Sequence, residues 1–543
     1  MQRSLPPDPV RLEIYRHQLS ALTGEMGAAL RRAAYSPNIK ERRDYSCAVF
    51  DGTGRVIAMG DHMPVHLGAM PMSVAAALEQ ASPLLPGDVV VLNDPFAGGT
   101  HLPDITLVSA AYAADRVIAH LAVRAHHADV GGVTAGSMPL AREIYQEGLR
   151  LPPVRLMKRG RRVEDVWRVI LANVRTPVER EGDLSAQCAA LTTGERRIHE
   201  LVERRGADDV RDAMAGLLAY ADRLVRQGLA RIPDGEYRAE DVLEDDGFGN
   251  GPFPIRVRLV KAGDQMLADF DGSAAQATGG INAVRAITSS CVRYVVRCVL
   301  ESLLGETLPA GGGAMTAVRL HTPPGSVVDA QPPAAVAAGN VETSQRITDV
   351  LLAAFAQALP DTIPAQSQGT MNNLALGGTD PATGEAFAYY ETAGGGMGGG
   401  PSASGLSAVH VHMTNSLNTP IEALEHAYPL RIRRYAVRRG TGGGGRHGGG
   451  DGLVRDLELL ADADISLLTE RRTRAPAGAA GGDCGARGEN VLIRGGLEEV
   501  LPAKVTLRCG AGDIVSIRTP GGGGWGSPTE HRNDDGSAIE GRK

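Results

Sequence analysis

The segment from Asn93 to Pro139 constrains this chain more than any other part of its sequence. It opens with turn residues, Asn93 to Pro95, and two glycines follow shortly after. Because such residues end regular structure, the apolar run from Asp88 to Leu92 is predicted to be a strand that leads into a loop. The loop carries His101 and Asp104, and their spacing lets a loop or a single helical turn aim both side chains at one point.

A second strand is predicted from Val117 to His126. Its odd positions are all apolar, whereas its even positions include His120, Arg124 and His126. A strand with this pattern is expected to bury one face and to turn the other towards a cleft. His126 then points the same way as His120, and His127 points to the opposite side.

His101, Asp104 and His126 together indicate a metal site. Imidazole and carboxylate groups are the expected ligands of Zn, Mn or Fe, and such a set leaves a position open for water or substrate. Taken singly, each histidine is more simply explained as a core or surface residue. Their clustering in one glycine-bounded region favours the metal. His62 and His66 are expected to have structural roles, because nothing in the sequence fixes their distance to His101.

The bulk properties of the chain exclude several classes of protein. It has 543 residues and a formal net charge of −7, which argues against a nucleic-acid partner. We find no apolar run of about 18 residues that could span a membrane. The polar N-terminus is not expected to be a signal peptide, and six dispersed cysteines fit a reducing compartment. We therefore expect a cytoplasmic protein.

Helical and alternating patterns both occur, which predicts an α+β fold. Residues 1–232 are predicted to form an N-terminal mixed α/β domain that carries the metal site. A turn at Pro233 to Gly235 separates it from a β-rich domain, residues 233–527, with buried helices and glycine-rich loops. A hairpin is predicted at Gly263. The polar residues 528–543 are predicted to be a disordered tail.

Three glycine runs lie in the second half, and the chain has 69 glycines in all, close to twice the usual share of about 7 per cent. Such loops can bind phosphate through backbone amides. None of them is a Walker A motif, however, and the sequence contains no Gly-Lys dipeptide. The GxSxG and HExxH motifs are absent too, so neither a serine hydrolase nor a zincin is predicted.

Long motifs resemble the hydantoinase B and 5-oxoprolinase family, which also includes N-methylhydantoinase beta subunits, acetone carboxylase alpha subunits and caprolactamase beta subunits. The resemblance covers nearly the whole chain. It rests on the strings NDPFAGGTHLPDITL, HHADVGGVTAGSMP, GNVETSQRITDVL, GTMNNL, NTPIEALEHAYPLRIRRY, GGGGRHGGGDGLVRD and TPGGGGWG.

The resemblance implies further site residues. An acidic residue near the predicted strand from Asp44 to Phe50 completes the family's metal site; we prefer Asp44, with Glu41 as the alternative. Both are also explained as surface acids beside two arginines. The implied set then has three parts: the metal ligands Asp44, His101, Asp104 and His126; the catalytic groups His127 and Asp129, which would orient a ligand or move a proton; and the cavity residues Asn340, Glu342 and Arg346.

The resemblance also implies a function, the opening of a cyclic amide such as a hydantoin, 5-oxoproline or a lactam. A hydantoinase A-like partner would bind ATP and phosphorylate the amide oxygen, and this chain, with one divalent metal, would complete the reaction. We therefore expect a hetero-oligomer. Two alternatives stay open, an alpha subunit of an ATP-dependent ketone carboxylase and a non-catalytic scaffold subunit. Converging ligands count against the scaffold.

Overall fold

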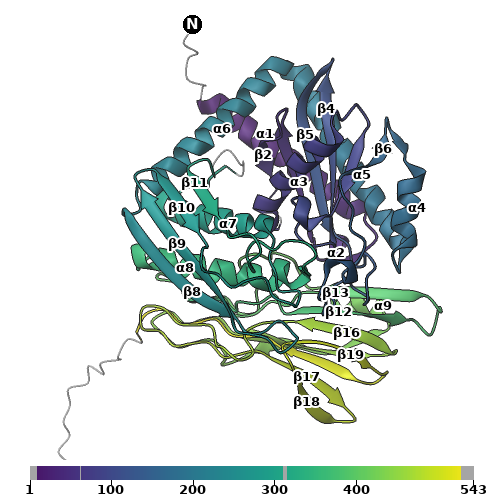
Figure 1. Cartoon of the computed structure of the whole chain (residues 1–543), viewed down its shortest axis with the longest axis vertical. Coiled ribbons are helices and arrows are strands. Elements are labelled where there is room, and N and C mark those ends of the chain that lie inside the picture. Colours follow the sequence, from purple (N-terminus) through teal and green to yellow (C-terminus); the bar gives the residue numbers. More distant parts are fainter. Residues whose placement is uncertain (1–8, 61–62, 310–314, 528–543) are drawn as a thin grey trace, which may run out of the picture.

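The computed structural model describes residues 9–60, 63–309 and 315–527. Helices and strands are mixed along these segments, which confirms the predicted α+β class. Figure 1 shows the first sheet and its helices at the top of the view and the last strands at the bottom. His62 and the predicted tail, residues 528–543, lie outside the described residues.

The first sheet has seven strands in the order β2-β1-β5-β4-β3-β6-β7, and all neighbouring pairs are antiparallel. The long hairpin of β4 and β5 forms its centre, and Asp104 is paired with His126 at the open end of that hairpin. The strands are β1 (Tyr45–Asp51), β2 (Val56–Met59), β3 (Val89–Leu92), β4 (Asp104–Ala113), β5 (Arg116–His126), β6 (Val154–Lys158) and β7 (Arg161–Arg162).

Helices cover both faces of this sheet. Helices α1 and α5 pack on one face and α3 packs on the other. The even face of β5 is therefore buried, and our expectation that it borders a cleft is wrong: Ala122 packs into the core with residues of α3, and Arg124 Nη2 donates to Ser73 Oγ at 2.7 Å. The helices of this half are α1 (Pro9–Ala33), α2 (Pro37–Lys40), α3 (His66–Ala81), α4 (Glu164–Ala172), α5 (Pro177–Arg205) and α6 (Ala207–Leu229).

A second sheet, in the order β11-β10-β9-β8, packs against α8, and α7 lies between α3 and α8. The hairpin predicted at Gly263 is confirmed by the pairing of β9 with β10. One hydrophobic core continues from Leu12 to Leu468 and so crosses the predicted boundary at residue 233. The elements are β8 (Gly235–Leu243), β9 (Phe253–Ala262), β10 (Gln265–Asp269), β11 (Val318–His321), α7 (Arg285–Leu304), the π-helical turn η4 (Gly339–Thr343) and α8 (Ser344–Ala358).

Two further sheets, in the orders β13-β12-β16-β19 and β14-β15-β20-β17-β18, enclose a second core. Figure 1 shows them below the rest of the molecule. Their elements are β12 (Asn373–Thr379), β13 (Ala386–Glu391), α9 (Ile421–Ala427), β14 (Leu430–Arg438), β15 (Gly452–Leu459), β16 (Ala463–Leu468), β17 (Glu489–Arg494), β18 (Leu497–Leu501), β19 (Lys504–Cys509) and β20 (Ile514–Arg518).

The three glycine runs meet beside these sheets and bond to one another. Gly443 N donates to Gly522 O at 2.9 Å, and Gly522 N donates to Gly450 O at 2.9 Å. A Cβ on Gly522 would lie 2.1 Å from Met397 O, so only glycine permits this approach of backbone to backbone. These amides are used inside the protein, which explains the glycines without a bound phosphate.

Candidate functional site

The loop between β3 and β4 is held in place by Asn93. Its Nδ2 donates to Leu102 O at 2.7 Å and to Leu149 O at 2.9 Å, and its Oδ1 accepts from Leu151 N at 2.7 Å. Every hydrogen-bonding group of this amide is thus directed at the backbone, which fixes the loop as it enters β4. The loop ends with His101, whose carbonyl accepts from Asp104 N at 3.1 Å.

Asp104 lies between two imidazoles. Its Oδ2 is 3.4 Å from His101 Nε2 and 3.4 Å from His66 Nε2, and it accepts a short hydrogen bond from Thr100 Oγ1. All four side chains are buried. His66 comes from the first turn of α3, and its Nδ1 is 2.9 Å from Ser46 Oγ on β1. The structure therefore gives Asp104 a second histidine, which we had expected to be merely structural.

His126 completes the cluster from the neighbouring strand. Its ring lies 5.0 Å from that of His101, at an angle of 67°. The amide of Asn38 lies 3.1 Å from His126 Nδ1, whereas His126 Nε2 is buried and has no hydrogen-bond partner. His126 N donates to Asp44 O at 3.0 Å, so Asp44 stands at the start of β1 beside His126. Asp44 is buried, whereas Glu41, just after α2, is partly exposed.

The charges of these groups depend on one another. Burial acts to raise the pKa of Asp104, but His101 and His66 outweigh it and hold that pKa well below its usual range. Burial, with a smaller effect of Asp104, raises the pKa of Asp44 to about 6. Burial and the neighbouring His101 lower the pKa of His126 well below its usual range. At neutral pH the cluster thus combines an ionised carboxylate with a neutral imidazole.

These residues fit a divalent metal by their chemistry. Three imidazoles and two carboxylates are suitable donors for Zn, Mn or Fe, and the unpartnered His126 Nε2 is a buried nitrogen that lacks a ligand. Within the described residues, no three His, Cys, Asp or Glu side chains are already arranged as a metal-binding group. The metal therefore stays a prediction.

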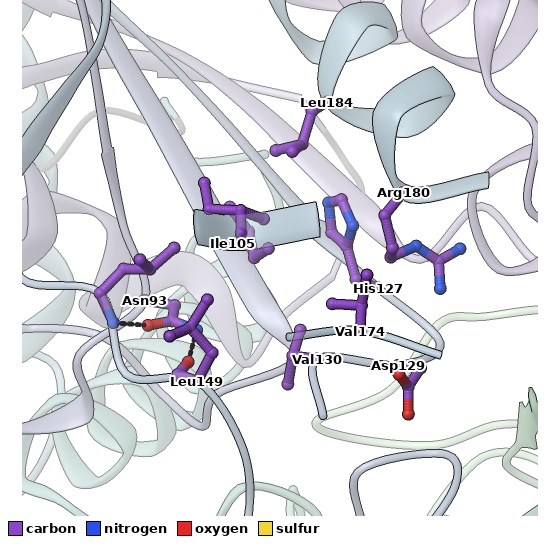
Figure 2. Close-up of a pocket in the computed structure, with 11 residues that line it drawn as sticks. Asn93, Ile105, His127, Asp129, Val130, Leu149, Val174, Arg180 and Leu184 are labelled. Carbon is purple, nitrogen blue, oxygen red and sulfur yellow. Dashed lines mark hydrogen bonds between the residues drawn. The ribbon is translucent and has the colours of Figure 1, made fainter. Parts of the chain in front are cut away.

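His127 and Asp129 point away from this cluster. His127 Nε2 lies 3.0 Å from Gln187 Oε1 on α5, and Asp129 Oδ1 pairs with Arg175 Nη1 at 2.9 Å. Figure 2 shows both residues with Arg180 around a cavity of about 10 Å³, which has room for at most one water molecule. Burial and the charge of Arg180 lower the pKa of His127 to about 4, so its ring is neutral near pH 7.

The three predicted cavity residues lie in different surroundings. Asn340 Nδ2 lies 3.2 Å from His101 Nε2, so Asn340 belongs to the cluster. Glu342 Oε1 instead accepts from Asn373 Nδ2 at 2.8 Å and from the backbone of Met371. Arg346 turns to a network of ion pairs, where its Nη1 lies 2.9 Å from Asp241 Oδ2. Thus only the first of the three touches a predicted metal ligand among these contacts.

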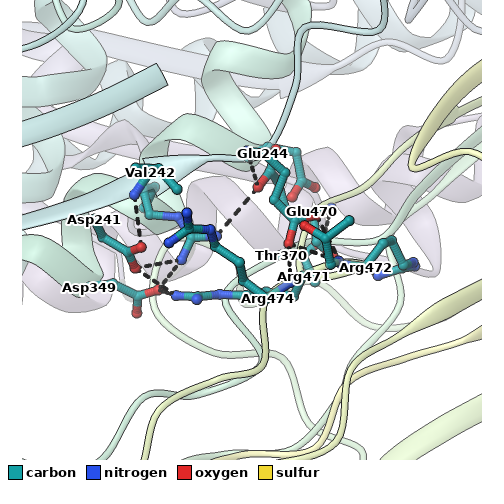
Figure 3. Close-up of polar contacts among 12 residues, drawn as sticks. Asp241, Val242, Glu244, Asp349, Thr370, Glu470, Arg471, Arg472 and Arg474 are labelled. Carbon is teal, nitrogen blue, oxygen red and sulfur yellow. Dashed lines mark hydrogen bonds and ion pairs between the residues drawn. The ribbon is translucent and has the colours of Figure 1, made fainter. Parts of the chain in front are cut away.

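The network around Arg346 joins distant segments. Asp349 Oδ2 lies 3.2 Å from Arg346 Nη1 and 2.7 Å from Arg471 Nη2. Arg471 also pairs with Asp241, on β8, at 3.0 Å, as Figure 3 shows. Glu470 pairs with Lys504 at 2.6 Å. The network thus ties α8 to β8 and to the segment after β16.

Sequence reasoning missed three residues of the cluster, His66, Asn38 and Tyr390. Tyr390, on β13, stacks on His126 with ring centroids 4.4 Å apart and planes at 9°. All three lie on elements remote from the loop that carries His101, so no local spacing connects them with it. The only signal was that the segment carrying His66 has glycines on both sides.

Comparison with known proteins agrees with this architecture. The model of the hydantoinase B/oxoprolinase family matches residues 8–528. The 5-oxoprolinase 1 of Arabidopsis thaliana is 38% identical over 96% of this chain, which spans only 42% of that relative. The solved ATP-dependent caprolactamase of Pseudomonas jessenii superposes with a TM-score of 0.89 at 28% identity and covers 96% of this chain and 91% of its own.

A structure of nucleotide-free acetone carboxylase has the same fold, with a TM-score of 0.83 at 16% identity over 96% of this chain and 76% of that chain. No helix of the described residues is long and apolar enough to cross a membrane.

Proposed function

The chain belongs to the hydantoinase B/oxoprolinase family, and from this premise we propose that it is the metal-dependent subunit of an ATP-dependent cyclic amide hydrolase. Its substrate class is a hydantoin, 5-oxoproline or a lactam. The observation that carries the proposal is the buried cluster in which Asp104 meets His66 and His101 while His126 Nε2 lacks a partner. The names 5-oxoprolinase and ATP-dependent caprolactamase among its relatives support the reaction class.

We propose that Asp44, His101, Asp104 and His126 hold one divalent metal. When bound, the metal would supply a Lewis acid that activates water for attack on the phosphorylated amide. The ionised Asp104 and the neutral His126 can present lone pairs, and that of His126 lies on Nε2 when the amide oxygen of Asn38 accepts a hydrogen bond from Nδ1–H. His66 Nε2 lies 3.4 Å from Asp104 Oδ2 and can orient that carboxylate, although burial lowers the pKa of His66.

We propose that ATP acts on a second subunit. An unactivated amide is a poor electrophile, and phosphorylation of its oxygen supplies a leaving group. This chain has no P-loop, and its plant relative is more than twice as long as the region that matches. A hydantoinase A-like partner in a cytoplasmic hetero-oligomer fits both facts. A reactive phosphorylated substrate would then pass between the two subunits.

The first test is the metal content of the purified chain beside His101→Ala and Asp104→Asn. We expect about one metal per chain in the wild type and none in either variant, with unchanged urea midpoints. A wild-type chain that stays metal-free after reconstitution with Zn, Mn and Fe would sink the metal role and favour the scaffold alternative.

The second test is turnover. We would mix the chain, a hydantoinase A-like subunit, ATP and each of 5-oxoproline, hydantoin and caprolactam, and measure ADP together with the ring-opened acid. ATP hydrolysis coupled to ring opening supports the proposal. Product formed only from acetone with bicarbonate would assign the chain to ketone carboxylation, and ATPase activity of this chain alone would contradict the division of labour.

A further inference from the structure

Tyr390 comes from the third sheet, yet it forms one wall of the cluster in the first. Its ring lies almost parallel to that of His126, with centroids 4.4 Å apart and an angle of 9°. Both side chains are buried, and the guanidinium of Arg42 lies 5.1 Å from the Tyr390 ring. Arg42 Nη1 also donates to Tyr390 O at 2.8 Å. Thus the ring of Tyr390 touches the cluster, and Arg42 holds its backbone.

A chain of hydrogen bonds fixes the Tyr390 ring. Its hydroxyl donates to Asn373 Oδ1 at 2.8 Å. Asn373 Nδ2 donates to Glu342 Oε1 at 2.8 Å and to Leu468 O at 2.9 Å. Both hydrogens of this amide are therefore engaged, and its oxygen has to face the tyrosine. The Tyr390 hydroxyl has one defined acceptor.

The sheet register explains why these residues meet. Tyr390 on β13 pairs with Ala375 on β12, and Asn373 precedes Ala375 by two positions. Residues two apart on a strand share a face, so Asn373 and Tyr390 lie on the same side of the sheet. Tyr389 lies on the other side, where its hydroxyl donates to Glu391 Oε2 at 2.7 Å. Two adjacent buried tyrosines thus have separate tethers, and only one of them stacks on His126.

The stack restrains the remaining freedom of His126. Asn38 holds Nδ1 on one edge of the imidazole, but a single contact still allows the ring to swing. A parallel aromatic ring at 4.4 Å opposes that rotation, because the imidazole would have to push Tyr390 away from Asn373. The direction of the unpartnered Nε2 is then set by two groups rather than one.

We propose that Tyr390 is a positioning residue for His126, and that Asn373 and Glu342 position Tyr390 in turn. In this proposal Glu342 acts through Asn373 and Tyr390 and does not touch His126 itself. The effect of Tyr390 on metal binding rests on the proposed function, in which His126 is a metal ligand. The restraint that Tyr390 places on the His126 ring does not depend on that function.

The test compares Tyr390→Phe, Tyr390→Leu and the matched control Tyr389→Phe in the full-length chain. The dissociation constant for Zn²⁺ is measured by competition with a chelator, and the spectrum of the Co²⁺-substituted chain reports the ligand geometry. Loss of such supporting contacts usually weakens metal binding by about 10- to 100-fold. We expect that loss in Tyr390→Leu, a smaller one in Tyr390→Phe, which keeps the stack, and none in Tyr389→Phe. The Co²⁺ spectrum should change only in the Tyr390 variants.

Unchanged affinity in both Tyr390 variants would overturn the proposal, as would an equal loss in Tyr389→Phe. A wild type that binds no metal would defeat the proposed function instead. The histidine Cε1–H signals of the metal-free chain then decide, with His126 assigned by its absence in His126→Gln. The His126 signal should shift and broaden in Tyr390→Leu and stay unchanged in Tyr389→Phe; an unaltered signal in Tyr390→Leu would overturn the proposal.

Discussion

The imidazoles around Asp104 and the arginines around Asp349 are equally buried, yet they meet their carboxylates in different ways. Asp104 Oδ2 lies 3.4 Å from each of two histidine nitrogens. Asp349 Oδ2 lies 2.7 and 3.2 Å from two guanidinium groups. A guanidinium keeps its charge at every accessible pH, whereas an imidazole can give up its proton and offer a lone pair instead.

This difference distinguishes a cluster that can take part in a reaction from a network that stabilises the fold. In the arginine network the guanidinium groups keep their charge, although burial raises the pKa of Asp349 to about 8. These ion pairs join α8, β8 and the segment after β16. We therefore expect the arginine network to support the fold rather than to bind a ligand. Both clusters keep buried atoms without a hydrogen-bond partner, among them Arg346 Nε and His126 Nε2, but only the imidazole nitrogen can offer a lone pair to a metal. Such a group is costly to bury unless something else binds it.

The largest effect is expected from His126→Gln, which removes the unpartnered nitrogen. A bound metal contributes several kcal/mol to a transition state, so turnover should fall at least about 100-fold. His120→Gln is the matched control, because His120 is also buried and lies on the same face of β5. Coupled ATP hydrolysis and ring opening measure the effect. Equal losses in the two variants would show that burial, rather than the cluster, matters.

Arg346→Met should act on stability and leave the cluster alone. Each carboxylate of the network keeps a second cation, since Arg471 pairs with Asp241 and Asp349 and Lys504 with Glu470. We therefore expect a loss of about 2–3 kcal/mol in the free energy of unfolding, below the usual cost of breaking a buried pair. Urea denaturation measures it. The metal content should not change.

The control for Arg346→Met is Arg433→Met, which breaks the more exposed pair with Glu458 and should cost less than about 0.5 kcal/mol. Loss of metal from folded Arg346→Met would break the distinction between the two clusters and return Arg346 to the substrate cavity.

The same contrast explains what could be predicted from the sequence. His101 and Asp104 are three residues apart, so their spacing alone is enough to bring them together. His126 pairs with Asp104 across a hairpin, which is still a local relation. His66 and Tyr390 could not be found this way, because α3 and β13 reach the cluster only through the packing of whole sheets.

Burial on the second face of β5 was missed for a related reason. Alternation along a strand shows which side chains share a face, but a second layer such as α3 is visible only in the fold. Arg346 was misleading in another way. It lies six positions after Asn340 across the change from η4 to α8, and its contacts are with Asp241 and Asp349. Nearness within a sequence motif is thus weaker evidence that two residues share a site than pairing across a hairpin.

Glu147 extends the comparison between the two clusters, because it is a buried carboxyl whose partners among the described residues include neither a histidine nor an arginine. Its Oε1 accepts from Val336 N at 2.7 Å and from Ala337 N at 2.9 Å. Burial outweighs these two bonds and raises the pKa of Glu147 to about 8. The folded chain then keeps a proton that the unfolded chain releases near the ordinary pKa of 4.5. Stability should therefore fall as the pH rises from about 4.5 towards 8.

Glu147→Gln removes this proton and keeps an oxygen for the two amides. Between pH 6 and pH 8 the fall in the free energy of unfolding should be smaller in Glu147→Gln than in the wild type, by about 1–2 kcal/mol. Urea midpoints at both pH values measure it, and Glu143→Gln, exposed in the same loop, should keep the wild-type slope. Parallel slopes in all three proteins would mean that Glu147 is ionised when folded. A buried carboxyl in this protein would then need neither histidine nor arginine to carry its charge.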